Sequence, residues 1–401
     1  VFAPFSLDTH IDHMTVRRAC EEAFSDPIWW IDIPYRSVDD AFGADTDRYI
    51  CAIYSGHEAE KRALVERYRS QVNALFPGGR VPETPDCFVI PPAHPLLHDD
   101  AQRADVTVVL PAYNESANIG NALRSLADQQ EVGFRITKIL VISDGSTDGT
   151  ADIARGVGDH RIAVREHTER RGKAMRLNEA HAETDMDIIV TMDADTILAH
   201  DRALAELITP FRYEPSIGLI GGHGEPVPAR TFTEEAVNVG HYAREPLRGN
   251  NVFSADGKLM AYRSELARRV HFPEGTIGVD HYLYFACRKE GMDYRYAPRA
   301  KAFFRSPATL RDAVRQNIRF SAVPARMEKY FGQDATEREY HVPLTRRLAA
   351  KYGQAVRHPL ATAYAFLIYT YCNMRGRLKE RALTSMWDIA VTTKQALPHY
   401  E

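Results

Sequence analysis

The feature that most constrains this chain is an apolar run at residues 188–192 that ends abruptly in two aspartates, Asp193 and Asp195. Such a run, with several β-branched side chains, favours a buried strand. Carboxylate oxygens at the mouth of a strand are ligands that Mg²⁺ or Mn²⁺ prefers when the ion bridges a diphosphate. Two more Asp-x-Asp triplets, at 45–47 and 185–187, do not directly follow an apolar strand. We therefore expect Asp195 to be the main metal ligand, and Asp193 to contact ribose or share the ion.

Two other apolar runs break into polar turns in the same way. Residues 106–110 lead into Pro-Ala-Tyr-Asn-Glu at 111–115, and Asn114 or Ser116 is expected to cap a helix that starts near Asn118. Residues 139–142 lead into the turn 143–150, and a helix is expected from about residue 151. In an open α/β sheet, turns that follow parallel strands meet at one edge, where ligands bind. Tyr113 and Asp144 should therefore lie close to the aspartate pair.

Several motifs occur in the order and spacing of a known family. They are the turn at 111–115, Ser-Asp-Gly-Ser-Thr-Asp-Gly-Thr at 143–150, Arg-Gly-Lys-Ala-Met-Arg-Leu-Asn at 171–178 and Met-Asp-Ala-Asp at 192–195. This series resembles the nucleotide-sugar half of glycosyltransferase family 2. Residues 257–263, 279–280 and 316–320 resemble its acceptor-side strand, its Glu-Asp pair and its Gln-x-x-Arg-Trp element. The resemblance runs from about residue 106 to 320. It implies the GT-A fold, an α/β architecture with a Rossmann-like, mostly parallel sheet flanked by helices.

The resemblance also assigns roles to individual residues. Tyr113 would offer a ring face to the base, Asp144 would accept a hydrogen bond from a uracil imide, and Lys173 or Arg171 would neutralise the diphosphate. The expected donor-binding set is Pro111, Ala112, Tyr113, Glu115, Asp144, Arg171, Lys173, Asp193 and Ala194. Asp193 and Asp195 would hold Mn²⁺ or Mg²⁺. Gln316 and Arg319 would line the acceptor or diphosphate side, although a structural ion pair is an alternative for them.

Asp280 is the expected catalytic base, and it also has a structural interpretation. It precedes an expected helix at 281–289, so it could instead be an N-cap that satisfies backbone N–H groups. Two departures from the family pattern affect this side of the site: Val279 stands where an acid usually precedes Asp280, and Phe320 stands where a tryptophan is usual. In the family, that tryptophan motif is often associated with processive polysaccharide synthases. We therefore expect transfer of one or a few sugars.

The expected activity is inverting, metal-dependent transfer of a sugar from a nucleotide-diphosphate sugar, with UDP favoured, to an acceptor hydroxyl. A non-catalytic sugar- or nucleotide-binding protein is one alternative, and a membrane-peripheral transferase acting on a lipid-linked acceptor is another. A nucleotidyltransferase would need a Gly-rich phosphate loop after the first strand, which the turn at 111–115 is not.

Charge is unevenly distributed along the chain. The net charge is −4, with 50 Lys+Arg and 54 Asp+Glu. Residues 301–401 carry 17 Lys+Arg and 8 Asp+Glu, so this part is basic and the rest is acidic. A basic C-terminal part suits an anionic ligand, a membrane surface or simply a solvated helical surface. The overall balance disfavours nucleic acid as a partner.

We expect an N-terminal extension at 1–104 with a Pro-rich connector, a GT-A domain at 105–332 and a helical C-terminal region at 333–401. Five scattered cysteines without CxxC spacing, and the lack of a visible signal peptide, favour the cytoplasm. The longest run free of Asp, Glu, Lys and Arg, residues 358–374, includes polar residues and falls short of the roughly 20 apolar residues of a spanning helix. Residues 360–372 are apolar on most sides and are followed by Arg375, Arg377, Lys379 and Arg381, which suggests a core helix, a homodimer contact or peripheral membrane contact.

Overall fold

The computed structural model describes most of the chain from residue 103 onward and shorter stretches before it. The described residues are 2–4, 11–24, 28–31, 50–54, 58–67, 86–90, 103–183, 185–379 and 390–397. The chain divides into two compact units, residues 1–103 with 209–215, and residues 104–208 with 216–401. The predicted domain boundaries at 104 and 332 stay predictions.

The first unit contains a four-stranded sheet of order β1-β2-β4-β3. Its elements are β1 (Phe2–Pro4), α1 (Ile11–Ala23), β2 (Ile28–Ile31), β3 (Ile50–Tyr54), α2 (Glu58–Val65), β4 (Asp86–Ile90) and α9 (Pro210–Tyr213). Strand β4 falls inside the predicted Pro-rich connector and pairs antiparallel with β2 and β3. That part of the connector is therefore a sheet strand. The connector's prolines lie outside the described residues.

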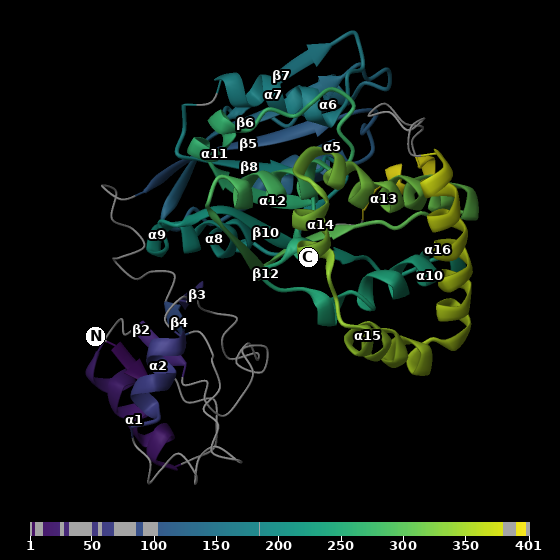
Figure 1. Cartoon of the computed structure of the whole chain (residues 1–401). Coiled ribbons are helices and arrows are strands. Elements are labelled where there is room, and N and C mark those ends of the chain that lie inside the picture. The colour runs from purple at the N-terminus through teal and green to yellow at the C-terminus, as the bar shows by residue number, and fades with distance from the viewer. Residues whose placement is uncertain are drawn as a thin grey trace. The chain divides into compact units, whose positions relative to one another are not determined.

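The second unit is built on an eight-stranded sheet of order β7-β6-β5-β8-β11-β10-β12-β9 (Figure 1). Its strands are β5 (Ala104–Ala112), β6 (Phe134–Asp144), β7 (Ile162–His167), β8 (Ile188–Met192), β9 (Ile197–Leu198), β10 (Ile217–Pro226), β11 (Leu259–Arg263) and β12 (Asp293–Phe304). The first four strands in the sheet order run parallel to one another. Strand β11 is antiparallel to β8 and to β10, and β10 is parallel to β12. The predicted α/β sheet is confirmed, with a parallel half and a mixed half.

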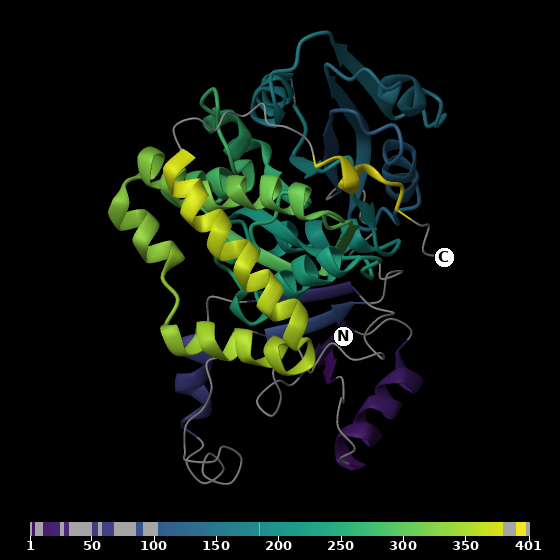
Figure 2. The ribbon, with the colours of Figure 1, turned by 90° about the vertical axis from the view of Figure 1, so that its right-hand side faces the viewer.

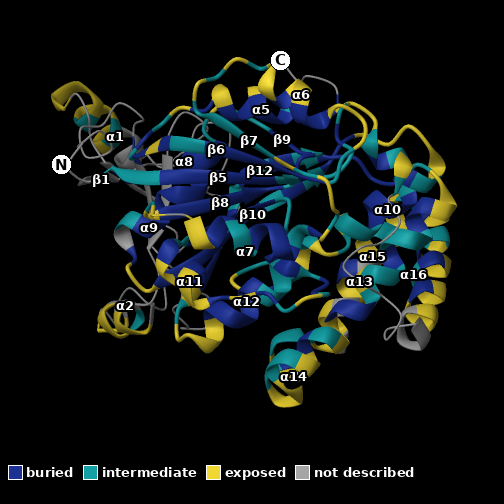
Figure 3. Cartoon of the chain, turned by 90° about the horizontal axis from the view of Figure 1, so that it is seen from above, coloured by how far each residue is buried: buried dark blue, intermediate teal, exposed yellow. Residues whose placement is uncertain are grey.

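Helices cover both faces of this sheet, α5 and α6 on one face and α7, α11 and α12 on the other (Figure 3). The helices of the unit are α5 (Ile119–Ala127), α6 (Thr150–Arg155), α7 (Lys173–Glu183), α8 (Ala203–Ile208), α10 (Phe232–Tyr242), α11 (Ser264–Arg269), α12 (Val279–Lys289), α13 (Leu310–Phe331), α14 (Gln333–Tyr340), α15 (Leu344–Arg357) and α16 (Pro359–Lys379). Three short 3-10 helices, η3 (Glu245–Leu247), η4 (Val252–Ser254) and η6 (Val391–Lys394), complete it. Strand β8 is buried along its whole length, as its apolar run predicts.

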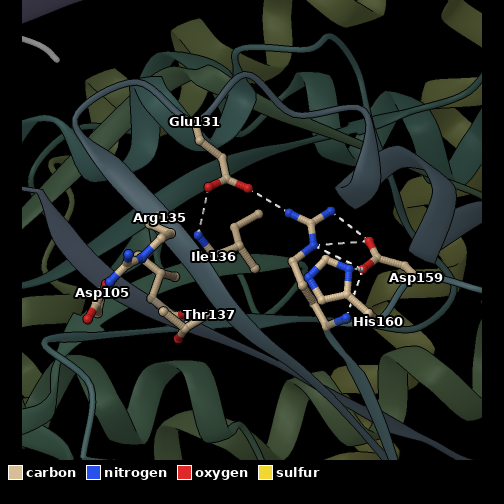
Figure 4. A network of polar contacts seen from close by, with 9 residues as sticks. Asp105, Glu131, Arg135, Ile136, Thr137, Asp159 and His160 are labelled. Carbon is tan, nitrogen blue, oxygen red and sulfur yellow. Dashed lines mark hydrogen bonds and ion pairs between the residues drawn. The ribbon is translucent and has the colours of Figure 1, made fainter. Parts of the chain in front are cut away.

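Ion pairs tie together the amino-terminal ends of the strands (Figure 4). The Arg161 guanidinium lies 2.6 Å from Glu131 and 2.6 Å from Asp159. Glu131 also accepts a hydrogen bond of 3.1 Å from the backbone N–H of Ile136 on β6. These contacts lie at the amino-terminal ends of the strands, whereas the polar turns lie at the carboxyl ends. The ion pairs therefore do not use the side chains of the polar turns.

The predicted strand–turn–helix units are present, but one predicted cap is wrong. Helix α5 begins after Asn118, which occupies the N-cap position without a side-chain capping bond. Asn114 instead accepts a hydrogen bond from the Thr147 N–H at 2.8 Å, and the N–H of Ser116 donates to Asp148 at 3.0 Å. Both residues therefore join the first polar turn to the second, and these bonds replace the predicted cap.

Helix α16 is buried on one face only. It packs against α10 and α13, where Ala361 and Ala365 join a small apolar cluster with Ala236 and Val239 (Figure 2). Its other face exposes Leu360, Phe366, Leu367, Tyr371 and Met374. The predicted apolar helix is present, and one of its faces is buried while the other is exposed. The predicted homodimer and membrane contacts stay predictions. Arg381 and the side chains of Arg377 and Lys379 lie outside the described residues. Within the described parts of the chain, no helix is both long and apolar enough to cross a membrane.

The helix that leads into the candidate site, α7, carries a buried histidine that should make folding sensitive to acid. His181 Nε2 lies 2.8 Å from the Tyr262 hydroxyl, and burial, with a smaller effect of His271, lowers the pKa of His181 from 6.5 to about 4. The unfolded chain therefore binds more protons between pH 6.5 and pH 4, so the contribution of neutral His181 is present above this window and is lost as the pH falls through it. At pH 4 this loss amounts to about 3 kcal/mol.

We expect His181→Gln to weaken the pH dependence of the free energy of unfolding by about this amount, measured by urea titration at several values between pH 4 and pH 7.5. His160 is a matched control because its side chain is 94% exposed. His160→Gln should keep the wild-type pH dependence. An unchanged pH dependence in His181→Gln would contradict the assignment.

Candidate active site

A cavity of about 520 Å³ opens where the polar turns meet. Most of the residues predicted from the sequence line it. They are Pro111, Ala112, Tyr113, Glu115, Asp144, Lys173, Asp193, Ala194, Asp195, Asp280, Gln316 and Arg319. They come from the ends of β5, β6 and β8, from the starts of α7 and α12 and from within α13, so the fold brings together residues that lie far apart in the sequence. Their individual roles stay predictions.

The paired carboxylates stand at the carboxyl end of β8, as predicted. Burial and the neighbouring Asp193 raise the pKa of Asp195. In the described part of the chain, no group of three or more His, Cys, Asp or Glu side chains could hold an ion alone. Two adjacent carboxylates nevertheless fit Mg²⁺ or Mn²⁺ bound together with a diphosphate, because Mg²⁺ usually takes one or two carboxylates and completes its shell with phosphate oxygens and water.

Lys173 connects the carboxylate pair to the opposite wall of the cavity. Its Nζ donates to Asp193 at 2.5 Å and to the Gly257 carbonyl at 3.1 Å. Burial alone would lower the pKa of Lys173, but Asp193, with Asp280 and Asp195, outweighs burial and raises it. Lys173 is therefore a permanent positive charge placed beside the carboxylates, where it could contact a diphosphate.

Asp144 has a structural role that the sequence did not reveal. Its carboxylate accepts hydrogen bonds from the backbone N–H groups of Arg171 and Gly172, at 2.8 and 2.7 Å, and from Arg176 Nε at 2.6 Å. The Arg176 side chain is 2% exposed. Asp144 therefore joins the end of β6 to the start of α7, and any bond to a uracil imide would be added to these three.

Arg171, which was predicted for the donor-binding set, lies away from the cavity, and its role stays a prediction. Its side chain is 52% exposed and lies 3.9 Å from Glu179, and it does not line the cavity. Its neighbour Arg170 does, with the guanidinium carbon 3.9 Å from the centre of the Tyr113 ring. The turn that ends in Gly172, whose φ is +86°, decides which of the two arginines faces inward. Neighbouring residues with similar side chains could not be distinguished from the sequence.

The C-terminal residues 390–397 bring a cation into the site that the sequence did not indicate. Lys394 Nζ donates to the Tyr113 carbonyl at 2.6 Å and forms an ion pair with Glu115. The pKa of Glu115 is raised to about 8 by burial and by Asp195, and Lys394 opposes this shift. The segment lies along the start of α5, where the Leu397 carbonyl accepts a bond from Asn121 (Figure 2). No sequence motif predicts the contact between Lys394 and Tyr113, because the two residues are 281 positions apart in the sequence.

Helix α13 supplies another wall. Gln316, Arg319, Phe320 and Val323 line the cavity, and their spacing places them on one helix face. Burial lowers the pKa of Arg319 to about 10, although Asp193, Asp280 and Asp195 favour its charged form. Arg319 therefore interacts with every carboxylate proposed for the chemistry.

The structure excludes the capping interpretation of Asp280. The N-cap of α12 is Gly278, with φ of +74°, and Asp280 lies in the first turn after it. A side chain at Gly278 would also collide with Val323 of α13, since a Cβ there would lie 2.7 Å from Val323 Cγ1. Asp280 accepts a bond of 3.3 Å from the backbone N–H of Gly257 and lines the cavity.

Comparison with known proteins agrees with this geometry. Residues 107–270 match the profile of Glycosyl transferase family 2. The chain is 25% identical over 224 residues to a poly-β-1,6-N-acetyl-D-glucosamine synthase of Staphylococcus aureus, a match that covers 54% of this chain and 53% of the synthase. It is 23% identical over 235 residues to the Staphylococcus epidermidis synthase of the same name, covering 56% of each protein. The chain therefore spans about half the length of the curated relatives that it matches.

Solved structures of glycosyltransferases are also similar. A mannosyltransferase from Pyrobaculum calidifontis, in complex with GDP-mannose and Mn²⁺, is 21% identical with a TM-score of 0.47, covering 74% of this chain and 89% of that one. A glucosyl-3-phosphoglycerate synthase from Mycobacterium tuberculosis, in complex with Mn²⁺, UDP and its product, is 22% identical with a TM-score of 0.44, covering 59% and 83%.

The sheet, the carboxylates at its strand ends and the profile match define a glycosyltransferase domain of the GT-A fold. Residues 107–270, which are less than half of the chain, are similar to glycosyltransferase family 2. The profile match ends before Asp280, Gln316 and Arg319, so it does not cover the acceptor side.

Proposed function

We propose that this protein transfers a sugar from a nucleotide-diphosphate sugar, with UDP favoured, to an acceptor hydroxyl with inversion of configuration. The observation that carries the proposal is the convergence of Asp193, Asp195, Lys173 and Asp280 in one cavity with Tyr113 and Asp144. Tyr113 and Asp144, at the ends of β5 and β6, lie where we propose that the nucleotide base binds. The carboxylate pair and Lys173 mark the place for the diphosphate.

The residues divide the chemistry between two walls. Mn²⁺ or Mg²⁺ held by Asp195 and Asp193 would offset the charge that develops on the leaving diphosphate. Lys173 and Arg319 would add fixed positive charge there. Asp280 would take the acceptor's proton as the acceptor oxygen bonds to the anomeric carbon and the bond from that carbon to the diphosphate breaks. The presence of one candidate base, together with the family resemblance, supports inversion.

The number of sugars transferred separates two candidate functions. Phe320 lines the cavity where the resemblance leads one to expect a tryptophan, which supports transfer of one or a few sugars. The curated relatives are named as polysaccharide synthases, which favours chain growth as the second candidate.

We expect mass spectrometry of products from UDP-N-acetylglucosamine, UDP-glucose and GDP-mannose to show additions of one or a few sugars to an acceptor, or to water when no acceptor is present. A long ladder at low substrate conversion would establish chain growth instead. Donor binding without any release of nucleotide diphosphate would favour a non-catalytic binding protein.

A further inference from the structure

Arg305, just after the end of β12, is a buried cation with few partners. Its side chain is 1% exposed, and the closest carboxylate oxygen of an ion pair, on Glu234, lies 3.6 Å away, beyond ordinary hydrogen-bond length. Within the described part of the chain, none of its three guanidinium nitrogens has a hydrogen-bond partner. The other carboxylate oxygen of Glu234 accepts the backbone N–H groups of Arg230 and Thr231. A buried guanidinium in this state is costly unless a ligand completes its hydrogen bonds.

Arg305 lines the same cavity, in a wall that we call the basic wall, formed by His241, Arg244, Lys258, Phe304 and Arg305. Lys258 Nζ lies 4.1 Å from the centre of the Phe304 ring, and the His241 ring centre lies 4.8 Å from it. Burial, with Lys258 and Arg244, holds the pKa of His241 well below its usual value. Asp256, which accepts hydrogen bonds from Lys258 Nζ at 2.8 and 3.1 Å, opposes this shift.

The basic wall adjoins the proposed chemistry but belongs to the mixed half of the sheet. The Lys258 carbonyl accepts the backbone N–H of Asp193 at 3.3 Å, and the N–H of Gly257 bonds Asp280. The residues proposed to bind the nucleotide base and the ribose come instead from the ends of β5, β6 and β8. A group on the basic wall would therefore lie near Asp280 as well as near Asp193.

The charges of the whole cavity point the same way. Its lining includes nine Lys or Arg and six Asp or Glu side chains, and two of the cations, Arg248 and Arg315, pair with Glu245 and Asp312 outside the lining. A nucleotide-diphosphate sugar and a divalent cation together carry no net charge, so the donor complex adds no net negative charge to this lining. A second anionic group would complement it.

We propose that the basic wall, centred on Arg305, binds an oxyanion carried by the acceptor, either a phosphate or a carboxylate. The proposal rests on the proposed transferase function and names its acceptor class. A planar guanidinium suits either oxyanion because it can form two parallel hydrogen bonds. The hydroxyl of the same acceptor would then be held next to Asp280.

The test measures binding to protein saturated with UDP and Mg²⁺, at constant ionic strength set with chloride. Inorganic phosphate is the minimal probe, and glucose 6-phosphate, glucuronate and glucose form a matched series of phosphate, carboxylate and neutral acceptors. By calorimetry, we expect at least one anionic sugar to bind roughly 10-fold or more tightly than glucose, and Arg305→Met to weaken that binding roughly 10- to 100-fold. Arg305→Lys should recover part of it. The stronger of the two anionic sugars identifies the source of the oxyanion.

Controls separate this inference from the donor proposal. Arg305→Met should keep the wild-type affinity for UDP. Arg288→Met removes an exposed arginine of α12 that is paired with Asp293, and it should change neither the affinity for UDP nor that for the anionic sugars. If circular dichroism shows that Arg305→Met does not fold, the double variant Arg305→Met/Glu234→Gln is measured in its place, because it removes both buried charges. Absence of UDP binding would overturn the proposed function itself.

Three results would overturn the inference alone. The first is equal affinity for glucose and both anionic sugars. The second is phosphate binding that UDP abolishes, which would place the anion at the donor diphosphate. The third is an Arg305-dependent preference for UDP-glucuronate over UDP-glucose, which would assign the cation to the donor sugar.

Discussion

Asp195→Asn should bind UDP equally well with and without Mn²⁺, whereas the wild-type protein should bind UDP more tightly when Mn²⁺ is present. An amide is a poor substitute for a carboxylate that shares a hard cation with a diphosphate. Because the metal supplies several kcal/mol of transition-state charge stabilisation, kcat should fall on the order of 10²-fold or more. Isothermal titration with UDP and GDP, with Mn²⁺ or with EDTA, checks this. UDP should be preferred to GDP, and EDTA should remove most of the Mn²⁺-dependent gain.

Asp185→Asn is the matched control, because Asp185 belongs to a second Asp-x-Asp triplet, is exposed and does not line the cavity. This variant should behave like the wild-type protein. Metal-independent UDP binding by the wild-type protein, or full turnover by Asp195→Asn, would show that the metal assignment is wrong.

Asp280→Asn should lower kcat roughly 10²-fold or more while leaving UDP affinity and stability close to wild type. The amide can still accept the bond from the Gly257 N–H, and Gly278 rather than Asp280 occupies the helix N-cap. The fold should therefore tolerate the change, and what is lost is the ability to take a proton. Single-turnover kinetics with circular dichroism and UDP titration separates these effects.

The structure also limits which other carboxylate could be the catalytic base if Asp280 is not. Asp256 lines the cavity, but although burial would raise its pKa, Lys258 and Arg248 hold that pKa well below its usual value, so it is a poor base. Glu274 is exposed and does not line the cavity. Full activity in Asp280→Asn would contradict the assignment, and Asp256→Asn would then be the next variant to measure.

The parts of the site that could be predicted share one property: the signal is local. An apolar run that breaks into a polar turn places Asp193, Asp195, Tyr113 and Asp144 at strand ends, because the crossover rule brings the ends of parallel strands to one edge. The face of α13 that carries Gln316 and Arg319 follows from the helical repeat. Local capping at Asn114 or Ser116 was wrong because each residue bonds the neighbouring turn instead.

Local signals were therefore enough to predict the parallel strands, their polar ends and the resemblance to glycosyltransferase family 2, since a few adjacent residues carry each of them. The packing of distant segments determines that Arg170 rather than Arg171 lines the cavity, that Lys394 pairs with Glu115, and that Arg305 is buried and lines the same cavity as Lys258 and His241. These placements depend on how distant segments pack. Because the packing of the whole unit decides them, no short stretch of sequence records them.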